Sequence, residues 1–483
     1  MNKQKRLQKT ILWIVVGIVS VLLLTYLVFV WFFRSHYYFH TEISGKNVSC
    51  KTPQDVIDWN IREANDFLVT IHGRENVKYH IKGSDFGYAY EPSGLEESFK
   101  ASQNPFLWPK SLFVPSKYEL TSGITYDTTK LKASVGDLDL FDHEKTIEPK
   151  DAYVELTEDG YKVVPEVTGT TPIPEQVIEL VSDAVSSGNI SVALTDECYV
   201  KPNLTSESDQ IVDCTKTIDK YLRGGITYKI GNETEELTSK DILNMLSILE
   251  DGITVVLDEE PIEKFVQTLA TKYNTYGDKR EFTTSLGDVI TISGGDYGWV
   301  ISKSKEKEQI MKDILSGNPV EREPVYEQTA MEPGPNDIGD TYLEIDYSNQ
   351  HYYYYVDGTL TLDADIVSGR IINGNGSPDG IFKIVYCQKN AVLVGEDYSA
   401  PVNYFMPFAY NVGFHDAPWN PTFGGDYYIE HGSHGCINMK PQDAENLYNL
   451  VEKGTPVVAY YRTPVQLTSE SAQISNAQSY VAP

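Results

Sequence analysis

The sequence has few cysteines. Its 483 residues include five, at Cys50, Cys198, Cys214, Cys387 and Cys436. Because the number is odd and the residues are scattered without a Cys-x-x-Cys pair, they do not form a disulfide framework. A single bridge between Cys198 and Cys214 stays open as an alternative. The N-terminal segment described below predicts that the rest of the chain lies outside the cell. In such a chain with so few cysteines, the cysteine left without a partner is predicted to be a retained reactive thiol.

Basic residues are scarce relative to acidic ones. The chain has 40 Lys and Arg against 69 Asp and Glu, which gives a formal net charge of −29 and a pI of about 4.7. Such a surface repels phosphate backbones and anionic lipid headgroups. The composition therefore argues against a nucleic-acid partner and against a protein that lies on an anionic membrane surface.

Long apolar runs are absent apart from one near the N-terminus. It extends from Ile11 to Phe33, and at about 1.5 Å per residue a helix of this length crosses a hydrocarbon core of about 30 Å. Its aromatic end differs from the small-residue cleavage site of a signal peptide. We predict an uncleaved transmembrane anchor over residues 11–33, with a buried core helix as the alternative. We expect a chain shortened by the residues up to about Tyr38 to be soluble and active.

The basic residues before this run set the expected topology. Lys3, Lys5, Arg6 and Lys9 precede it, and positive charge is enriched on the cytoplasmic side of membrane spans. We therefore expect residues 1–10 to be a cytoplasmic tail and everything after Arg34 to lie outside the cell.

Between this run and the C-terminal region, three segments follow one local pattern. They begin at Ser84, Glu158 and Gly295, and each is typical of a turn, an aromatic strand and a helix. Chance similarity is the alternative to an internal repeat. We predict two α+β modules, over residues 40–205 and 206–330.

The second module has clear local signals. Thr238 and Asp241 have the spacing of a capping box, which predicts a helix that ends at Gly252 and is followed by a strand. Prolines in residues 317–339 predict a domain boundary.

Residues 338–463 are predicted to form a mostly β domain. Asp357-Gly358 is a strong hairpin signal between alternating runs. One helix is expected from Pro441 to Gly454, followed by a strand and a polar tail over residues 464–483. The predicted fold class is α+β, with an anchor helix, mixed α/β modules and a mostly β domain.

The stretch Glu430–Met439, "EHGSHGCINM", surrounds Cys436 with small residues and histidines. A thiol with a free pKa near ~8.5 needs a base to attack a carbonyl, and His415, His431 and His434 are candidates. A buried structural cysteine is one alternative. A zinc site with Glu430 is another, although Gly432 weakens the helical spacing that such sites use.

Together, "HGSHGCINM" and the upstream "GFHDA" resemble the active-site signature of the L,D-transpeptidases, the YkuD-type catalytic domain. The resemblance covers about residues 338–461, including the glycine-rich stretch Gly369–Ile384. It implies a YkuD-like β-sandwich. The preceding modules are similar to the peptidoglycan-binding domains that accompany such catalytic domains.

The resemblance also implies roles for individual residues. It makes Cys436 the nucleophile and His415 its general base. Four further positions are implied to support the site: Ser433, His434, Gly435 and Asp416. The backbone N–H groups of Gly435 and Cys436 would form the oxyanion hole. Asp416, the residue after the base, would orient the imidazole. Asn438 stands where many members carry arginine, so a substrate-carboxylate contact there would lack charge.

The implied reaction joins two peptidoglycan stem peptides, a donor and an acceptor, at their third residues through a cysteine acyl-enzyme. It uses no metal and no organic cofactor. The alternatives are an L,D-carboxypeptidase or amidase that passes the acyl group to water, and an inactive wall-binding scaffold protein. Aromatic residues before the motif predict a partly apolar cleft, unless they belong to the core: Tyr404, Phe405, Phe408, Tyr410 and Trp419. The expected location is the bacterial cell membrane, crossed once by one helix, with the C-terminal domains facing the cell wall.

Overall fold

The computed structural model describes residues 2–121, 123–395 and 398–475, and the chain divides into two compact units. The first unit comprises Met1–Tyr153 and Val164–Ser208, and the second comprises Val154–Val163 and Asp209–Pro483. The end of the predicted polar tail, residues 476–483, lies outside the described residues. This division differs from the predicted module boundary, because a hairpin within the predicted first module packs in the second unit. There Val154 N–H donates to Gly252 O at 2.9 Å.

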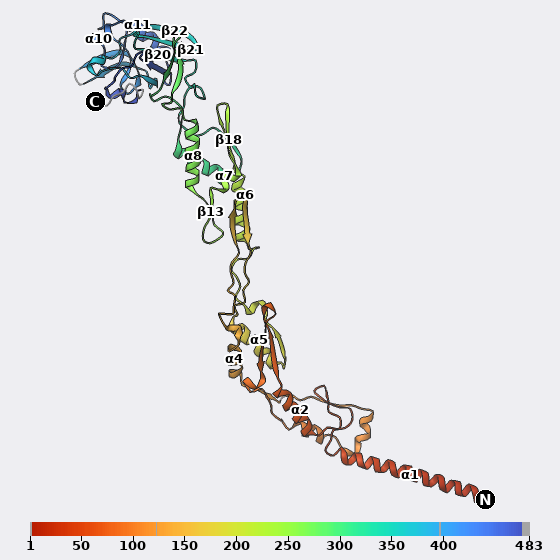
Figure 1. Ribbon diagram of the computed structural model, residues 1–483. Coiled ribbons are helices and arrows are strands. Elements are labelled where there is room, and N and C mark those ends of the chain that lie inside the picture. The colour runs from red at the N-terminus through yellow and green to blue at the C-terminus, as the bar shows by residue number, and fades with distance from the viewer. Residues whose placement is uncertain (1, 122, 396–397, 476–483) are drawn as a thin grey trace. The chain divides into compact units, whose positions relative to one another are not determined.

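Helix α1 (Asn2–Phe32) begins the first unit (Figure 1). Its segment Lys3–Phe32 is apolar and long enough to cross a membrane. The chain becomes buried directly after this helix, since Phe33 and Tyr37 are fully buried and Tyr37 packs with Ile43, Val48 and Val56. Shortening the chain by the residues up to Tyr38 would therefore also remove core side chains of the first unit.

The rest of the first unit contains two small three-stranded sheets. In one, β1 (Thr41–Ile43) lies between β2 (Lys46–Asn47) and β6 (Ser116–Tyr118). In the other, β3 (Leu68–His72) lies between β4 (Lys78–Lys82) and β10 (Ser191–Ala193). Apolar residues of the second sheet share a core with α4 (Thr128–Gly136) and α5 (Pro174–Ser186).

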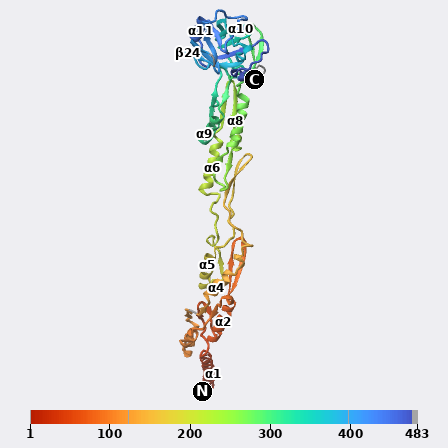
Figure 2. The ribbon, with the colours of Figure 1, turned by 90° about the vertical axis from the view of Figure 1, so that its left-hand side faces the viewer.

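Residues 209–330 of the second unit form a module that we call the second module. Strand β11 (Ile226–Ile230) pairs with β12 (Glu233–Leu237) and β18 (Val320–Arg322). Helices α6 (Asp209–Leu222), α8 (Glu259–Tyr273) and α9 (Lys303–Ser316) lie close together (Figures 1 and 2). The first part of the predicted domain boundary, residues 317–339, therefore contains β18, which is a strand of this module.

The helix predicted from the Thr238 capping box is only partly correct. The capping box with Asp241 is present and begins α7 (Ser239–Leu243). The chain then leaves the helix, because β13 (Leu246–Ile248) pairs with β14 (Val255–Leu257). The Asp251 carboxylate accepts hydrogen bonds from the backbone N–H groups of Ile253 and Thr254 and so stabilises the turn between these strands. The strand predicted after Gly252 is confirmed.

The C-terminal domain, residues 338–463, is built from two sheets. The first has the order β22-β21-β20-β28-β23 and the second β24-β25-β26-β27. The strands of the first sheet are β20 (Tyr342–Asp346), β21 (His351–Val356), β22 (Thr359–Asp365), β23 (Gly380–Lys383) and β28 (Pro456–Tyr460). Those of the second are β24 (Gln388–Val394), β25 (Ser399–Ala409), β26 (Val412–Asp416) and β27 (Ile437–Met439). One apolar core contains side chains of both sheets, which confirms the predicted mostly β domain.

Two local predictions for this domain have different outcomes. The Asp357-Gly358 hairpin is confirmed, and both turn residues have positive φ, 48° and 74°, as a tight hairpin turn requires. The predicted helix begins at Pro441 but ends early, since α11 spans Pro441–Tyr448. Val451 beyond it is buried in the domain core instead of continuing the helix.

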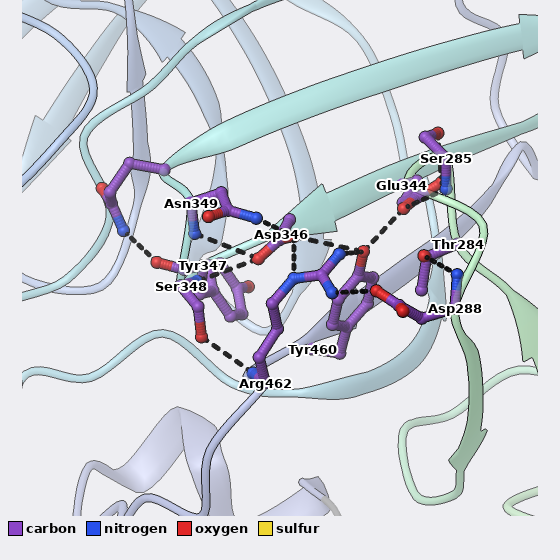
Figure 3. A network of polar contacts seen from close by, with 11 residues as sticks. Thr284, Ser285, Asp288, Glu344, Asp346, Tyr347, Ser348, Asn349, Tyr460 and Arg462 are labelled. Carbon is purple, nitrogen blue, oxygen red and sulfur yellow. Dashed lines mark hydrogen bonds and ion pairs between the residues drawn. The ribbon is translucent and has the colours of Figure 1, made fainter.

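A hairpin of the second module packs on the C-terminal domain. It consists of β15 (Arg280–Thr283) and β16 (Val289–Ile292), whose Phe282 and Ile292 share an apolar cluster with Val458. Figure 3 shows the polar contacts beside it, where Arg462 lies between Asp346 and Asp288, at 2.6 Å and 2.5 Å. Module and domain therefore share both apolar and ionic contacts.

Candidate active site

The pairing of β26 with β27 puts the segment of the predicted nucleophile beside the strand of the predicted base. They pair in parallel, with His415 opposite Asn438, and Cys436 directly precedes β27. The Cys436 thiol accepts a backbone hydrogen bond from Gly413 and lies 3.5 Å from Asn411 O. Gly413 is two residues before His415 on β26, so the thiol meets this strand about 7 Å from the His415 backbone. Side chains of this size can meet over that distance.

Burial favours the electrically neutral form of both groups. Burial raises the pKa of the Cys436 thiol to about 11, although the Gly413 hydrogen bond opposes this shift. Burial lowers the pKa of His415, although the hydrogen bond and charge of Asp416 oppose the change. Desolvation disfavours the charged form of each group. The pair therefore rests as thiol and imidazole.

The main chain of Asp416 orients the imidazole. His415 Nδ1 lies 3.0 Å from the Asp416 carbonyl oxygen, and a carbonyl can only accept, so Nδ1 carries the proton and Nε2 has the free lone pair. The Asp416 carboxylate instead accepts from Asn403 N–H, Asn403 Nδ2 and Tyr404 N–H, at 2.7, 2.8 and 2.9 Å. The predicted orienting residue thus acts on the ring through its backbone.

The loop before Cys436 is closed by its own hydrogen bonds. Ser433 Oγ donates to Cys436 O at 2.5 Å and accepts from Gly435 N–H at 3.0 Å. The carbonyl of Gly435 accepts from Ser377 Oγ at 2.6 Å. Gly435 has a φ of 125°, which favours glycine. Because its N–H is bonded within the loop, it differs from the open oxyanion donor that the resemblance implies.

The glycine-rich segment after β22 supports this loop. Ser433 N–H donates to Ser368 O, and Arg370 N–H donates to Ser433 O, both at 2.9 Å. A side chain at Gly432 would place its Cβ 2.7 Å from Arg370 N of the other segment, and one at Gly369 would place it 1.9 Å from Asn375 O within its own segment. Gly432 therefore allows the close approach of the two segments, and Gly369 allows the tight turn of its own segment.

The other predicted site residues lie around this centre. Asn438 is buried, and its backbone pairs with Val367. His434 is exposed, with its ring stacked on Tyr398 at 4.7 Å. His431 ends α10 (Tyr427–His431), where it is exposed and contacts the Tyr427 ring. Across residues 2–121, 123–395 and 398–475, no group of three His, Cys, Asp or Glu could hold a metal ion.

The aromatic residues before the motif divide between core and surface. Phe405 and Phe408 are buried, whereas Tyr404 donates to Glu445. Tyr410 and Trp419 are about half exposed, and the Trp419 ring lies 5.9 Å from the ring of His415. Only part of the predicted aromatic set is thus available to line a cleft.

Sequence reasoning missed Ser377 and Gly413. Ser377 joins the two loops, since its hydroxyl also accepts from Gly369 N–H at 2.9 Å. Gly413 donates to the thiol from a neighbouring strand. Both residues lie in stretches that carry the resemblance, Gly413 in "GFHDA" and Ser377 in Gly369–Ile384, but only the pairing of distant segments reveals their contacts.

The second module has a cleft of about 570 Å³. Its lining includes Trp299 and Tyr326, whose ring centroids are 4.7 Å apart, and Lys272. Trp299 Nε1 donates to Glu332 O at 2.8 Å, which holds the indole in place. Aromatic faces beside charged groups suit a ligand that is partly apolar and partly polar.

Comparisons with known proteins agree with these features. Residues 340–458 match the family model described as "L,D-transpeptidase catalytic domain", and residues 212–321 match the one described as "Putative peptidoglycan binding domain". A comparison with curated protein sequences gives no match.

Three of the solved structures that are similar to this chain come from L,D-transpeptidases. A cysteine-to-serine mutant of the Enterococcus faecium L,D-transpeptidase is 36% identical, with 52% of this chain and 100% of that chain covered and a TM-score of 0.43. The Ldtfm–avibactam carbamoyl enzyme is 37% identical, with 52% and 98% covered and a TM-score of 0.44. The catalytic domain of the E. faecium L,D-transpeptidase is 44% identical, with 25% and 97% covered and a TM-score of 0.24.

Proposed function

The chain belongs to the L,D-transpeptidase family, and from this premise we propose that it cross-links peptidoglycan stem peptides through a thioester on Cys436. The membership follows because the chain covers almost the full length of relatives that are more than a third identical to it. The observation that carries the proposal is the pairing of β26 with β27. It brings the thiol to the strand that holds the neutral imidazole of His415.

In the first half-reaction, Cys436 Sγ attacks the carbonyl between the third residue of a donor stem and its terminal D-alanine. Nε2 of His415 takes the thiol proton and returns it to the departing amine, and the acyl group stays on sulfur. Because both groups rest neutral, the proton moves as the bond to carbon forms. The Cys436 N–H stabilises the oxyanion, and the Gly435 N–H joins it only when the Ser433 hydroxyl turns away.

In the second half-reaction, an amine on a neighbouring stem attacks the thioester. The new amide joins two third-position residues, and Sγ leaves as the thiol after taking back a proton through His415. Hydrolysis competes whenever water reaches the thioester. The half-exposed Tyr410 and Trp419 provide apolar surface close to this point, so the acceptor can displace water there.

The other parts of the chain support a reaction at the cell wall. Helix α1 anchors the chain in the bacterial cell membrane, and the units after it face the wall. The cleft of the second module, with Trp299 and Tyr326, binds peptidoglycan. A sugar ring can stack on an aromatic face, whereas the ammonium of Lys272 is already paired with Glu235 and Glu233.

Intact-protein mass spectrometry with a stem tetrapeptide tests the acylation step. The wild-type chain should gain the mass of the acyl group, and Cys436→Ala should gain none. Cys387→Ser is the matched control, because it changes another partly buried thiol of the same domain and should keep the adduct. An adduct on Cys436→Ala, or one that an excess of chelator abolishes, would contradict the proposal.

A further inference from the structure

A short segment of the first unit exposes several large apolar side chains. It consists of the 3₁₀ helix η3 (Pro105–Leu112) and the two residues after it. Between 47% and 86% of each of these side chains is exposed: Phe106, Leu107, Leu112, Phe113 and Val114. Phe113 is the most exposed of them. Folded proteins rarely leave so many large apolar side chains of one short segment exposed to water.

This segment is attached to the side of α1, beside which η3 lies in orange in Figure 1. Tyr26 Oη donates to Phe106 O at 2.9 Å, and Trp108 Nε1 donates to Tyr26 O at 3.3 Å. The Trp108 ring also lies 4.8 Å from the ring of Phe29. The attachment uses backbone oxygens on both sides, so it fixes the level of η3 along α1.

That level lies within the apolar run and not beyond its end. Tyr26 is seven residues before Phe33, which is about 10 Å along a helix. If the hydrocarbon core ended on the N-terminal side of the level of η3, the run from Ile11 to Thr25 would have to cross the bilayer alone. Those residues span about 22 Å, which is short of the ~30 Å of a hydrocarbon core. A fully spanning α1 therefore carries η3 into the lipid.

The polar groups of the segment suit an interfacial position. Ser111 is buried, and its carbonyl lies 2.9 Å from His40 Nδ1 on the protein side. Lys110 is exposed, and a lysine at this level extends its ammonium toward the phosphate headgroups. Tryptophan is enriched at the same boundary in membrane proteins.

We propose that Phe106–Val114 is a second membrane contact, which inserts into the leaflet at the C-terminal end of α1. This proposal rests on the anchor in the proposed function. Two contacts, α1 and the inserted segment, hold the base of the first unit against the bilayer. They restrict rotation of this unit about the axis of α1.

Lipid photolabelling of the full-length wild-type protein tests the insertion. The protein is reconstituted in phosphatidylcholine vesicles that contain a phospholipid with a diazirine in its acyl chain, and labelled peptides are mapped by mass spectrometry after irradiation. Label on both Ile11–Phe33 and Phe106–Val114 supports the proposal. Label on Ile11–Phe33 alone overturns the proposal and leaves the anchor intact. Absence of label from both overturns both.

A matched pair of variants separates insertion from simple proximity to α1. The double variant Phe106→Ser and Phe113→Ser should reduce labelling of the segment at least fivefold while labelling of α1 is unchanged. Val289→Ser, which replaces another highly exposed apolar residue, should change neither. Thermal unfolding should be the same in all three proteins, since the replaced side chains are exposed. Unchanged labelling of the segment in the double variant would show that these side chains do not insert.

Discussion

His415 Nδ1 lies 3.0 Å from the main-chain carbonyl oxygen of Asp416, the residue that follows it in the chain. This contact holds the neutral imidazole in the tautomer whose Nε2 can accept the thiol proton. It depends on the path of the backbone at the end of β26 and not on a second acidic side chain. The Asp416 carboxylate joins β26 to β25 and maintains that path.

Asp416→Asn should therefore affect stability more than chemistry. The carbonyl that holds His415 remains, so the acylation rate should fall less than about tenfold, whereas weaker bonds to Asn403 and Tyr404 should lower the free energy of unfolding by about 1–3 kcal/mol. Single-turnover acylation and urea unfolding measure the two effects. If acylation falls as far as in His415→Ala, the carboxylate itself orients the ring.

His415→Ala should reduce acylation by about 10²–10⁴-fold, because it removes the general base. His431→Ala is the matched control, since His431 is an exposed histidine of the same region, and it should lose less than about threefold. Acyl-enzyme formation followed by stopped-flow measurement or quenched mass spectrometry compares the two variants. Equal losses would transfer the role of base away from His415.

The pH dependence should show a neutral resting pair. Burial lowers the pKa of His415 below its usual 6.5, so protonation of the base should reduce kcat/KM for acylation only as the pH falls below 6.5. Burial raises the pKa of Cys436 to about 11, so alkylation of this thiol by iodoacetamide should still become faster above pH 9. An alkylation rate that is already constant from pH 7 would indicate a thiolate–imidazolium pair instead.

Arg462→Ala should destabilise the second unit. The Asp346 side chain is fully buried and loses its ionic partner in this variant, so the free energy of unfolding should fall by about 2–4 kcal/mol. Lys216→Ala removes a partner of the exposed Asp213 and should change the free energy by less than about 0.5 kcal/mol. Urea unfolding of the full-length protein in detergent measures both. Similar values for both variants would mean that the contacts in Figure 3 add little stability.

Sequence reasoning succeeded where the signal is local. The Asp357-Gly358 turn and the Thr238–Asp241 capping box follow from a few adjacent residues. It was wrong where strand pairing overrides a helical pattern, as when β13 pairs with β14 and interrupts the helix expected to reach Gly252. Helical spacing in that segment could not reveal a partner strand.

Sequence reasoning about the site succeeded and failed for the same reasons. The motif singled out Cys436 and His415, and their catalytic roles stay predictions that the experiments above test. The contributions of Ser377 and Gly413 depend on segments that meet only in the folded domain. The bonding of Gly435 N–H to Ser433 was equally hidden, because side-chain rotamers are not encoded in residue spacing.

The fate of the acyl group tests the central claim most directly. Purified acyl-enzyme is mixed with increasing concentrations of an acceptor stem peptide, and the products are quantified by mass spectrometry. We predict that cross-linked dimer rises with acceptor concentration and that free tripeptide stays a minor product, because the acceptor displaces water at the thioester. Tripeptide as the only product at every acceptor concentration would contradict transpeptidation and make the protein a carboxypeptidase.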